Sequence, residues 1–129
     1  IQCEYYALEG VTQLMRTIEA VRHAMNKELR LGSILMTMFD GRTRLSTQVD
    51  EEVRTHFARE TMSTRIPRSV RVSEAPSYSR SVLTYEPTSA GAVAYREAAA
   101  EFAKRHACDE HSTNTSGVKH PDASDTKKG

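Results

Sequence analysis

The chain has 129 residues, which suits one domain at most. Its 18 lysines and arginines stand against 17 aspartates and glutamates, so the net charge of +1 gives no global signal for nucleic acid or membrane. No apolar run approaches the roughly 20 residues needed to span a bilayer, and two cysteines without metal-ligand spacing favour a reducing cytoplasm over a disulfide scaffold.

The first predicted element is a helix between Leu8 and Met25. Its apolar residues recur at steps of three and four, which is the helical period. They are Leu8, Val11, Leu14, Met15, Ile18, Val21 and Met25. Ahead of this helix, Tyr5 and Tyr6 are predicted to be packing residues, and Cys3 a small buried residue.

A strand, a helix and a second strand are predicted next. The strand from Leu31 to Phe39 contains an unbroken apolar stretch after Ile34, which indicates burial on both faces, and Asp40-Gly41 ends it. Apolar residues then step by four from Leu45 to Phe57 and predict a second helix. Its acids are expected near the solvated side; they are Asp50, Glu51 and Glu52. Residues Met62 to Ile66 form a short strand that Pro67 stops.

The remaining chain is a long loop, a helix and a tail. Prolines punctuate the stretch from Pro67 to Pro87, where one short helix around Ser73 to Tyr78 is expected, and loops of this length are usually functional. The last helix runs from Ser89 as N-cap to about His106. Residues 108–129 are polar without periodicity and are expected to be a disordered tail, so that residues 1–107 form the packed part.

This alternation of helices and strands is typical of an α/β domain with a parallel sheet. Ligands of such sheets bind beyond the carboxyl ends of the strands. Those ends are expected at Ile1 to Glu4, Phe39 to Arg42 and Ile66 to Arg68.

Arginine is the most informative residue type. The stretch from Gly41 to Arg80 contains eight arginines, no lysine and five acids, which gives a local balance of +3. The planar guanidinium suits phosphate oxygens, so these arginines are candidates for phosphate or nucleic-acid contact. A solvated or ion-paired surface is the alternative.

Motifs for catalysis are absent from the sequence. There is no Gly-rich phosphate loop, no Ser/His/Asp order and no paired metal-ligand motif. No catalytic residue and no metal site are therefore assigned.

Three long segments carry a family signature: Gln2 to Gly10, Leu35 to Thr43 and Ile66 to Ser77. Together with Tyr85-Glu86-Pro87 and the residues from Ser89 to Tyr95, they resemble the ParA/Soj family of chromosome- and plasmid-partitioning ATPases. It covers residues 1 to about 105 in the family's order. One departure is that a Gly-Lys-Pro usual after Ala-Pro-Ser reads Ser79-Arg80-Ser81 here.

The resemblance implies the carboxy-terminal part of a P-loop NTPase (Rossmann-like) domain, incomplete without its amino-terminal half. Family members are deviant Walker A ATPases that bind ATP and Mg²⁺, form homodimers around ATP and bind DNA without sequence preference. A ParB/Spo0J-type centromere-binding protein stimulates them. The phosphate loop and the magnesium-binding acids would lie before Ile1, so the fragment itself is expected to be inactive and to bind ATP poorly. Its location is expected to be cytoplasmic and nucleoid-associated.

The same resemblance assigns residues to two kinds of contact. Thr37 and Met38, at the end of the first predicted strand, correspond to positions beside the adenine base. Pro67 and Arg68, in the loop after the second predicted strand, do so as well. Arg42 and Arg71 correspond to arginines implicated in DNA binding. Glu74 could be a free surface acid or the partner of a loop arginine.

A related function is possible on the same fold. A MinD-like cell-division positioning ATPase would act at a membrane instead of on DNA. Such relatives typically end in a basic amphipathic helix, whereas the tail of this chain has no apolar face to insert. The hypothesis of a DNA-partitioning ATPase that does not bind a membrane is therefore preferred.

Overall fold

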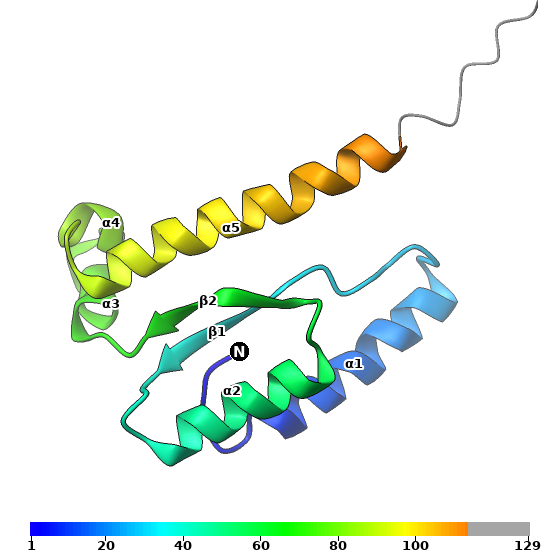
Figure 1. Ribbon diagram of the computed structural model, residues 1–129, viewed down its shortest axis with the longest axis horizontal. Coiled ribbons are helices and arrows are strands. Elements are labelled where there is room, and N and C mark those ends of the chain that lie inside the picture. Colours follow the sequence, from blue (N-terminus) through cyan, green and yellow to red (C-terminus); the bar gives the residue numbers. More distant parts are fainter. Residues whose placement is uncertain (114–129) are drawn as a thin grey trace, which may run out of the picture.

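Helices cover both faces of a parallel sheet in the computed structural model, which describes residues 1–113 and the side chains through Ala107. Helices α1 and α2 lie on one face and α5 on the other (Figure 1). The predicted α/β class is confirmed. The elements are α1 (Ala7–Ala24), β1 (Ile34–Phe39), α2 (Arg44–His56), β2 (Thr61–Pro67), α3 (Val70–Glu74), the 3₁₀ helix η1 (Ala75–Tyr78), α4 (Val82–Tyr85) and α5 (Ala90–Thr113).

Strand β1 has a parallel neighbour on each side. It pairs with β2, and on its other side Gln2 forms a parallel bridge with Thr37. The Cys3 amide donates to the Thr37 carbonyl at 3.0 Å, and the Thr37 amide donates to the Ile1 carbonyl at 2.7 Å. Around this isolated bridge, Ile1–Cys3 runs parallel to β1, and we call it the first strand although β1 and β2 alone form the regular sheet. The carboxyl ends of these three segments come together at one edge.

The pairing of β1 with β2 is irregular at its carboxyl end. Met36 faces Arg65 and Phe39 faces Pro67, so β1 has one residue more than β2 over this interval. Met38 lies within it and has a φ of 55°, the left-handed region that non-glycine residues seldom adopt. An extra residue of this kind is a β-bulge, and bulges redirect side chains at strand ends.

The core lies in two layers about the sheet. Cys3, Ile34 and Met36 pack with Val49 and Val53 of α2 on one face. On the other face, β2 packs against Ala94 and Ala98 of α5; its residues there are Met62 and Ile66. The burial predicted for Cys3 is confirmed. For β1 the prediction of burial on both faces holds only in part, because Ile34 and Met36 are buried whereas the alternate residues stay partly exposed.

Helix α1 forms as its periodicity predicts but packs less than expected. Val11 is its buried residue, and Leu14 of the same apolar stripe is 52% exposed. The packing role predicted for Tyr5 and Tyr6 is wrong, because they are 75% and 73% exposed. They contact each other edge to face ahead of the helix.

Helix α2 corrects the placement of Asp50. The side chain was expected near solvent, yet Asp50 is 3% exposed. Its Oδ2 atom accepts from Arg54 Nε at 2.9 Å and from Arg65 Nη2 at 2.7 Å. Two guanidinium partners offset the loss of hydration that burial imposes on a carboxylate.

The segment after β2 contains more helix than predicted. Instead of one short helix, α3, η1 and α4 follow one another between Val70 and Tyr85. Ser89 caps α5 as expected, because its Oγ accepts from the Ala92 amide at 3.2 Å. Helix α5 continues to Thr113, past the predicted end, since no Gly or Pro interrupts it there. Residues 114–129, the rest of the predicted tail, lie outside the described residues.

Candidate functional site

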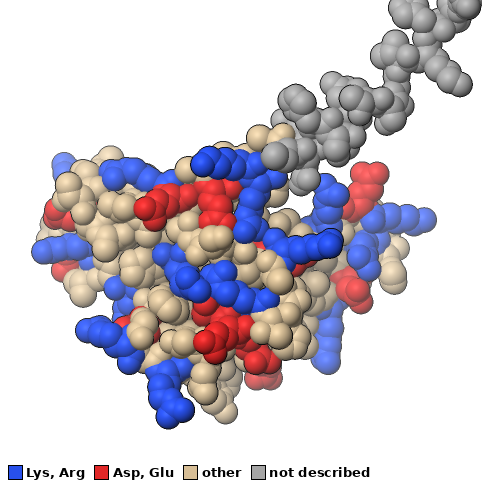
Figure 2. All heavy atoms as spheres, viewed as in Figure 1, with Lys and Arg blue, Asp and Glu red and all other residues tan. Residues whose placement is uncertain are grey.

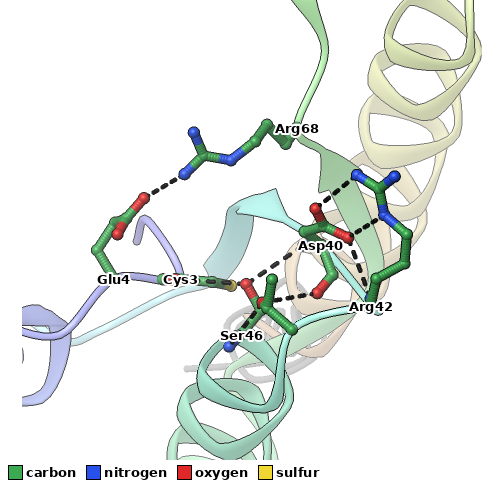
Figure 3. A network of polar contacts seen from close by, with 7 residues as sticks. Cys3, Glu4, Asp40, Arg42, Ser46 and Arg68 are labelled. Carbon is green, nitrogen blue, oxygen red and sulfur yellow. Dashed lines mark hydrogen bonds and ion pairs between the residues drawn. The ribbon is translucent and has the colours of Figure 1, made fainter.

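The candidate site is the edge where the strands end at their carboxyl termini, which we call the carboxyl edge. Figure 3 shows two ion pairs brought to this edge from three strand ends, Glu4 with Arg68 and Asp40 with Arg42, and Ser46 lies near Asp40 at the start of α2. Parallel strands place their carboxyl ends together, so this convergence follows from the topology.

The four residues predicted beside a nucleotide base lie on adjacent strand ends. Thr37 and Met38 lie just before Phe39, the last residue of β1, while Pro67 ends β2 and faces Phe39. Arg68 follows directly, and its amide donates to the Phe39 carbonyl at 2.9 Å. The structure therefore brings the predicted base contacts to one edge; whether they bind a base stays a prediction.

Two of these residues are engaged within the chain. Thr37 Oγ1 donates to the Ile1 carbonyl at 3.2 Å, which ties β1 to the first residues. The guanidinium of Arg68 forms an ion pair with Glu4, so a side-chain link crosses the end of β1. Both partners are about half exposed, which limits the contribution of this pair to stability.

The loop after β1 is organised by Asp40. The Thr43 amide donates to the Asp40 carbonyl at 3.0 Å, and Thr43 in turn caps α2 by accepting from the Ser46 amide at 3.3 Å. Ser46 Oγ accepts from the Asp40 amide at 3.3 Å and donates to the Cys3 carbonyl at 3.4 Å. These bonds fix the loop against both β1 and the first strand.

Arg42, a predicted DNA contact, lies in this loop and pairs with Asp40. Its Nε donates to Oδ1 at 2.9 Å and its Nη2 to Oδ2 at 2.8 Å. The hydrogen bonds from Arg42 lower the pKa of Asp40 to about 2, so the carboxylate is charged at neutral pH. The side chain of Arg42 is 89% exposed.

Arg71, the other predicted DNA contact, lies on α3. Its Nη1 donates to Glu74 Oε2 at 3.1 Å, and the Tyr85 hydroxyl donates to the same oxygen at 3.4 Å. Of the two readings of Glu74, pairing with a loop arginine is therefore the one observed. No described contact joins Arg71 to Arg42, so the two arginines are separate points on the surface.

Charge is mixed over the rest of the surface. Figure 2 shows basic and acidic side chains interspersed across the viewed face, in keeping with the net charge of +1. A ligand that depends on positive charge must therefore use local groups such as Arg42, Arg68 or Arg71. Among residues 1–113, no helix is both long and apolar enough to cross a membrane.

Sequence reasoning missed several polar residues that position the site and the sheet. Ser46 and Glu101 of α5 were not singled out, and Asp50 was expected near solvent instead of in a buried pair. Glu101 accepts from the Ser63 amide at 2.7 Å and from the Thr64 amide at 2.8 Å. The available signal was an acid followed four residues later by an arginine, as in Asp50–Arg54 and Glu101–Arg105.

Comparison with known proteins identifies the family. No family model matches the chain. It is 50% identical over 105 residues to the chromosome-partitioning ATPase Soj of Thermus thermophilus, covering 81% of this chain and 42% of the relative. It is also 50% identical over 105 residues to the chromosome partitioning protein ParA of Caulobacter vibrioides, covering 81% of this chain and 39% of the relative.

A third relative is the sporulation initiation inhibitor protein Soj of Bacillus subtilis, which is 47% identical over 103 residues, or 80% of this chain and 41% of the relative. The chain thus spans about two fifths of the length of these relatives. Identity at this level over four fifths of the chain leaves no doubt of common ancestry. By sequence, the chain belongs to the ParA/Soj family of partitioning proteins.

Proposed function

We propose that this chain is the carboxy-terminal part of an ATPase that partitions chromosome or plasmid DNA. The observation that carries the proposal is 50% identity over 105 residues to relatives named for chromosome partitioning. In this proposal the complete protein binds ATP and Mg²⁺ and forms a homodimer in the ATP-bound state. A ParB/Spo0J-type centromere-binding protein stimulates its ATP hydrolysis. It is cytoplasmic and associates with the nucleoid through non-specific DNA binding.

The chain supplies the base side of the nucleotide site in this proposal. Thr37, Met38, Pro67 and Arg68 would surround the adenine, a role that their adjacent positions on β1 and β2 support. Phosphate and magnesium contacts provide most of the binding energy in P-loop enzymes, and the 129 residues contain no phosphate loop. Calorimetric titration of this chain with Mg-ATP is therefore expected to show no binding in the micromolar range.

Arg42 and Arg71 would contact DNA phosphates. Support comes from their exposure, 89% and 54% of the side chain, and from their positions beyond the strand ends, Arg42 in the loop after β1 and Arg71 on α3. Contacts to phosphates carry no sequence information, so binding would be equal for unrelated duplexes. Each contact would release condensed counterions and add about one unit to the slope of log affinity against log salt.

A chimera tests the proposal. Residues 1–105 replace the matching segment of the Thermus thermophilus relative, and ATP turnover, duplex affinity and chromosome segregation are measured. We expect all three to be retained. Replacing Arg42 and Arg71 with Ala should weaken binding to unrelated duplexes equally and lower the salt slope by about two units, with ATP turnover in the absence of DNA near normal.

A matched control is Arg16→Ala, which removes an exposed arginine of α1. It should leave the salt slope unchanged. If the double variant at Arg42 and Arg71 also keeps the slope of the unmodified chimera, the two arginines do not contact DNA. If the unmodified chimera neither hydrolyses ATP nor segregates chromosomes while remaining folded, the partitioning function is wrong for this segment.

A further inference from the structure

We propose that Asp40 is a positioning residue that orients the guanidinium of Arg42 for contact with a DNA phosphate. The inference rests on the DNA contact of the proposed function and adds a residue whose own charge opposes DNA. It follows from the hydrogen bonds by which Asp40 holds the Arg42 guanidinium and from the guanidinium N–H donors that these bonds do not use (Figure 3).

Asp40 binds Arg42 at three points. Oδ1 accepts from the Arg42 amide at 3.0 Å and from its Nε at 2.9 Å, while Oδ2 accepts from Nη2 at 2.8 Å. A bidentate pair of this kind fixes the plane of the guanidinium. The added amide bond also fixes the backbone from which the side chain starts, so the direction of Arg42 is determined at both ends.

The pairing uses only one side of the guanidinium. Arginine has five N–H donors, and Asp40 occupies the Nε donor and one donor of Nη2. Both donors of Nη1 and the second donor of Nη2 have no described partner within residues 1–113. Because the side chain is 89% exposed, these remaining N–H donors of the guanidinium can bind a phosphate while Asp40 stays bound.

Asp40 is itself held firmly. Its side chain is 16% exposed, its amide donates to Ser46 Oγ, and its carbonyl accepts from the Thr43 amide. Ser46 also links to the carbonyl of Cys3 in the first strand. The orientation given to Arg42 is therefore anchored in two strands and in the start of α2.

The pair of Arg71 and Glu74 provides a contrast. It has one described contact, from Nη1 at 3.1 Å, and both side chains are substantially exposed. A single contact does not fix the plane of a guanidinium. Removing Glu74 therefore takes away a negative charge beside a candidate DNA arginine without removing an orienting clamp.

Two opposite effects decide the sign of the Asp40 substitution. A carboxylate near DNA repels phosphate, so its removal alone would strengthen binding. A rotamer-rich side chain that is already oriented loses less entropy when it binds, so removing the clamp would weaken binding. The three-point geometry leads us to expect that the loss of orientation outweighs the relief of repulsion.

The experiment measures duplex affinity of the full 129-residue chain by fluorescence anisotropy at several salt concentrations, starting low, where non-specific binding is strongest. The variants are Asp40→Asn, Arg42→Ala, their combination, and Glu74→Gln as the charge-matched control. Asparagine keeps an oxygen for the Arg42 amide, so it preserves the loop while it removes the charged two-oxygen clamp. Thermal unfolding checks that each variant is folded.

We expect Asp40→Asn to bind about two- to ten-fold more weakly, the range that corresponds to immobilising one such side chain. Its salt slope should fall by up to about one unit. Adding Asp40→Asn to Arg42→Ala should cost nothing more, because the residue acts through Arg42. Glu74→Gln should bind as tightly as the unmodified chain, or more tightly.

Other outcomes separate this proposal from the function on which it rests. If Asp40→Asn strengthens binding as Glu74→Gln does, or leaves it unchanged, Asp40 only neutralises Arg42 and the positioning role is wrong. If Arg42→Ala binds DNA as tightly as the unmodified chain, Arg42 does not contact DNA. The DNA contact assigned in the proposed function is then wrong, whatever Asp40 does. If the unmodified chain binds no duplex at low salt, the positioning role is wrong for this chain, and the chimera then decides the proposed function separately.

Discussion

Ser79 has a backbone conformation that its side chain disfavours. It follows η1 with φ 52° and ψ 37°, the left-handed conformation, and its amide donates to the Pro76 carbonyl at 2.9 Å. This is the position where the ParA/Soj resemblance leads one to expect glycine. The turn is therefore formed despite the substitution, at the steric cost that a Cβ atom pays in this region.

Replacing Ser79 with glycine should stabilise the chain. We expect Ser79→Gly to raise the free energy of unfolding by about 1 kcal/mol, because the left-handed conformation costs glycine nothing sterically. Urea unfolding followed by circular dichroism measures the change. The control Ser77→Gly, inside η1, should lower stability by about 0.5–1 kcal/mol. Equal effects of the two substitutions would show that the conformation of Ser79 is not strained.

Individual residues were predictable where local chemistry decides their role. The N-cap Ser89 and the buried Cys3 could be assigned from neighbouring sequence. Asp50 could not, because its position on α2 suits either solvent or a buried pair, and the choice depends on Arg65 from β2. Burial disfavours the charged form of Asp50, but hydrogen bonds from Arg65 and Arg54 outweigh it and lower the pKa.

Helices α3 and α5 approach each other closely at Gly91. A Cβ atom added there would lie 2.4 Å from Val72 Cγ2, whereas one added at Gly10 of α1 would meet nothing within 4 Å. The two glycines therefore have opposite reasons to be present: Gly91 permits contact between helices, and Gly10 only lowers the helix propensity of α1.

We expect Gly91→Ala to destabilise the chain by about 1–3 kcal/mol, because the β-branched Val72 has few rotamers into which it can move. Gly10→Ala should instead stabilise it by up to about 1 kcal/mol through helix propensity. Thermal and urea unfolding of both variants give the comparison. A stabilising Gly91→Ala would mean that α3 can move away from α5 at little cost.

Side chains of α5 close the outer edge of β2. Glu101 accepts from the amides of Ser63 and Thr64, and Arg105 donates to the carbonyls of Arg59 and Thr61, both at 2.9 Å. Ser63 and Thr64 lie where β2 departs from regular pairing with β1. Helix α5 thereby takes the place of a further strand, which protects an edge that could otherwise pair with another chain.

The Glu101 contacts should make stability depend on pH. Partial burial disfavours the carboxylate, but the amides of Ser63 and Thr64 and the partner Arg105 outweigh this and lower the pKa to about 2 from the usual 4.5. The stabilisation is complete above the usual pKa and is lost as pH falls from about 4.5 through about 2.

Glu101→Gln should therefore lower the free energy of unfolding by about 1–2 kcal/mol at neutral pH, the value of hydrogen bonds to a charged group. The difference from the unmodified chain should shrink as pH approaches 2. Urea unfolding between neutral and acidic pH measures it. Glu97→Gln, at an exposed position of the same helix, is the control and should have little effect. A gap that stays constant with pH would contradict the assignment.

The long elements were predictable because their apolar residues repeat over several turns or fill a whole strand. Helices α1, α2 and α5 and strand β1 follow from such patterns, whereas β2 contains Ser63, Thr64 and Arg65 and is marked mainly by the proline that ends it. Helices α3 and α4 have too few residues for a period to show, and they are held by packing of Val72, Val82 and Tyr85 against α5. The carboxyl edge was predictable in outline because it follows from the order of parallel strands, whereas its ion pairs were not.

The two edges of the sheet differ in whether another element covers them. Helix α5 covers the outer edge of β2, but the short strand at Ile1–Cys3 pairs only with β1 among the described residues. Beside it a groove of about 470 Å³ runs along α1, lined by Tyr6, Val11 and Leu14 among others. An unpaired strand next to an exposed apolar helix face favours association with another chain.

The isolated chain should therefore self-associate. In sedimentation experiments we expect the weight-average mass to rise with concentration, and the unfolding midpoint to rise with it, because association stabilises the folded state by mass action. Leu14→Lys, in the groove, should raise the dissociation constant about ten-fold or more, since it removes a leucine from an apolar interface. Val70→Lys replaces a side chain that is 70% exposed on α3, away from the groove, and should have no such effect.

Two results together would rule out association through this face. The measured mass would equal that of the monomer at every concentration, and the sharp unfolding transition would not shift with concentration.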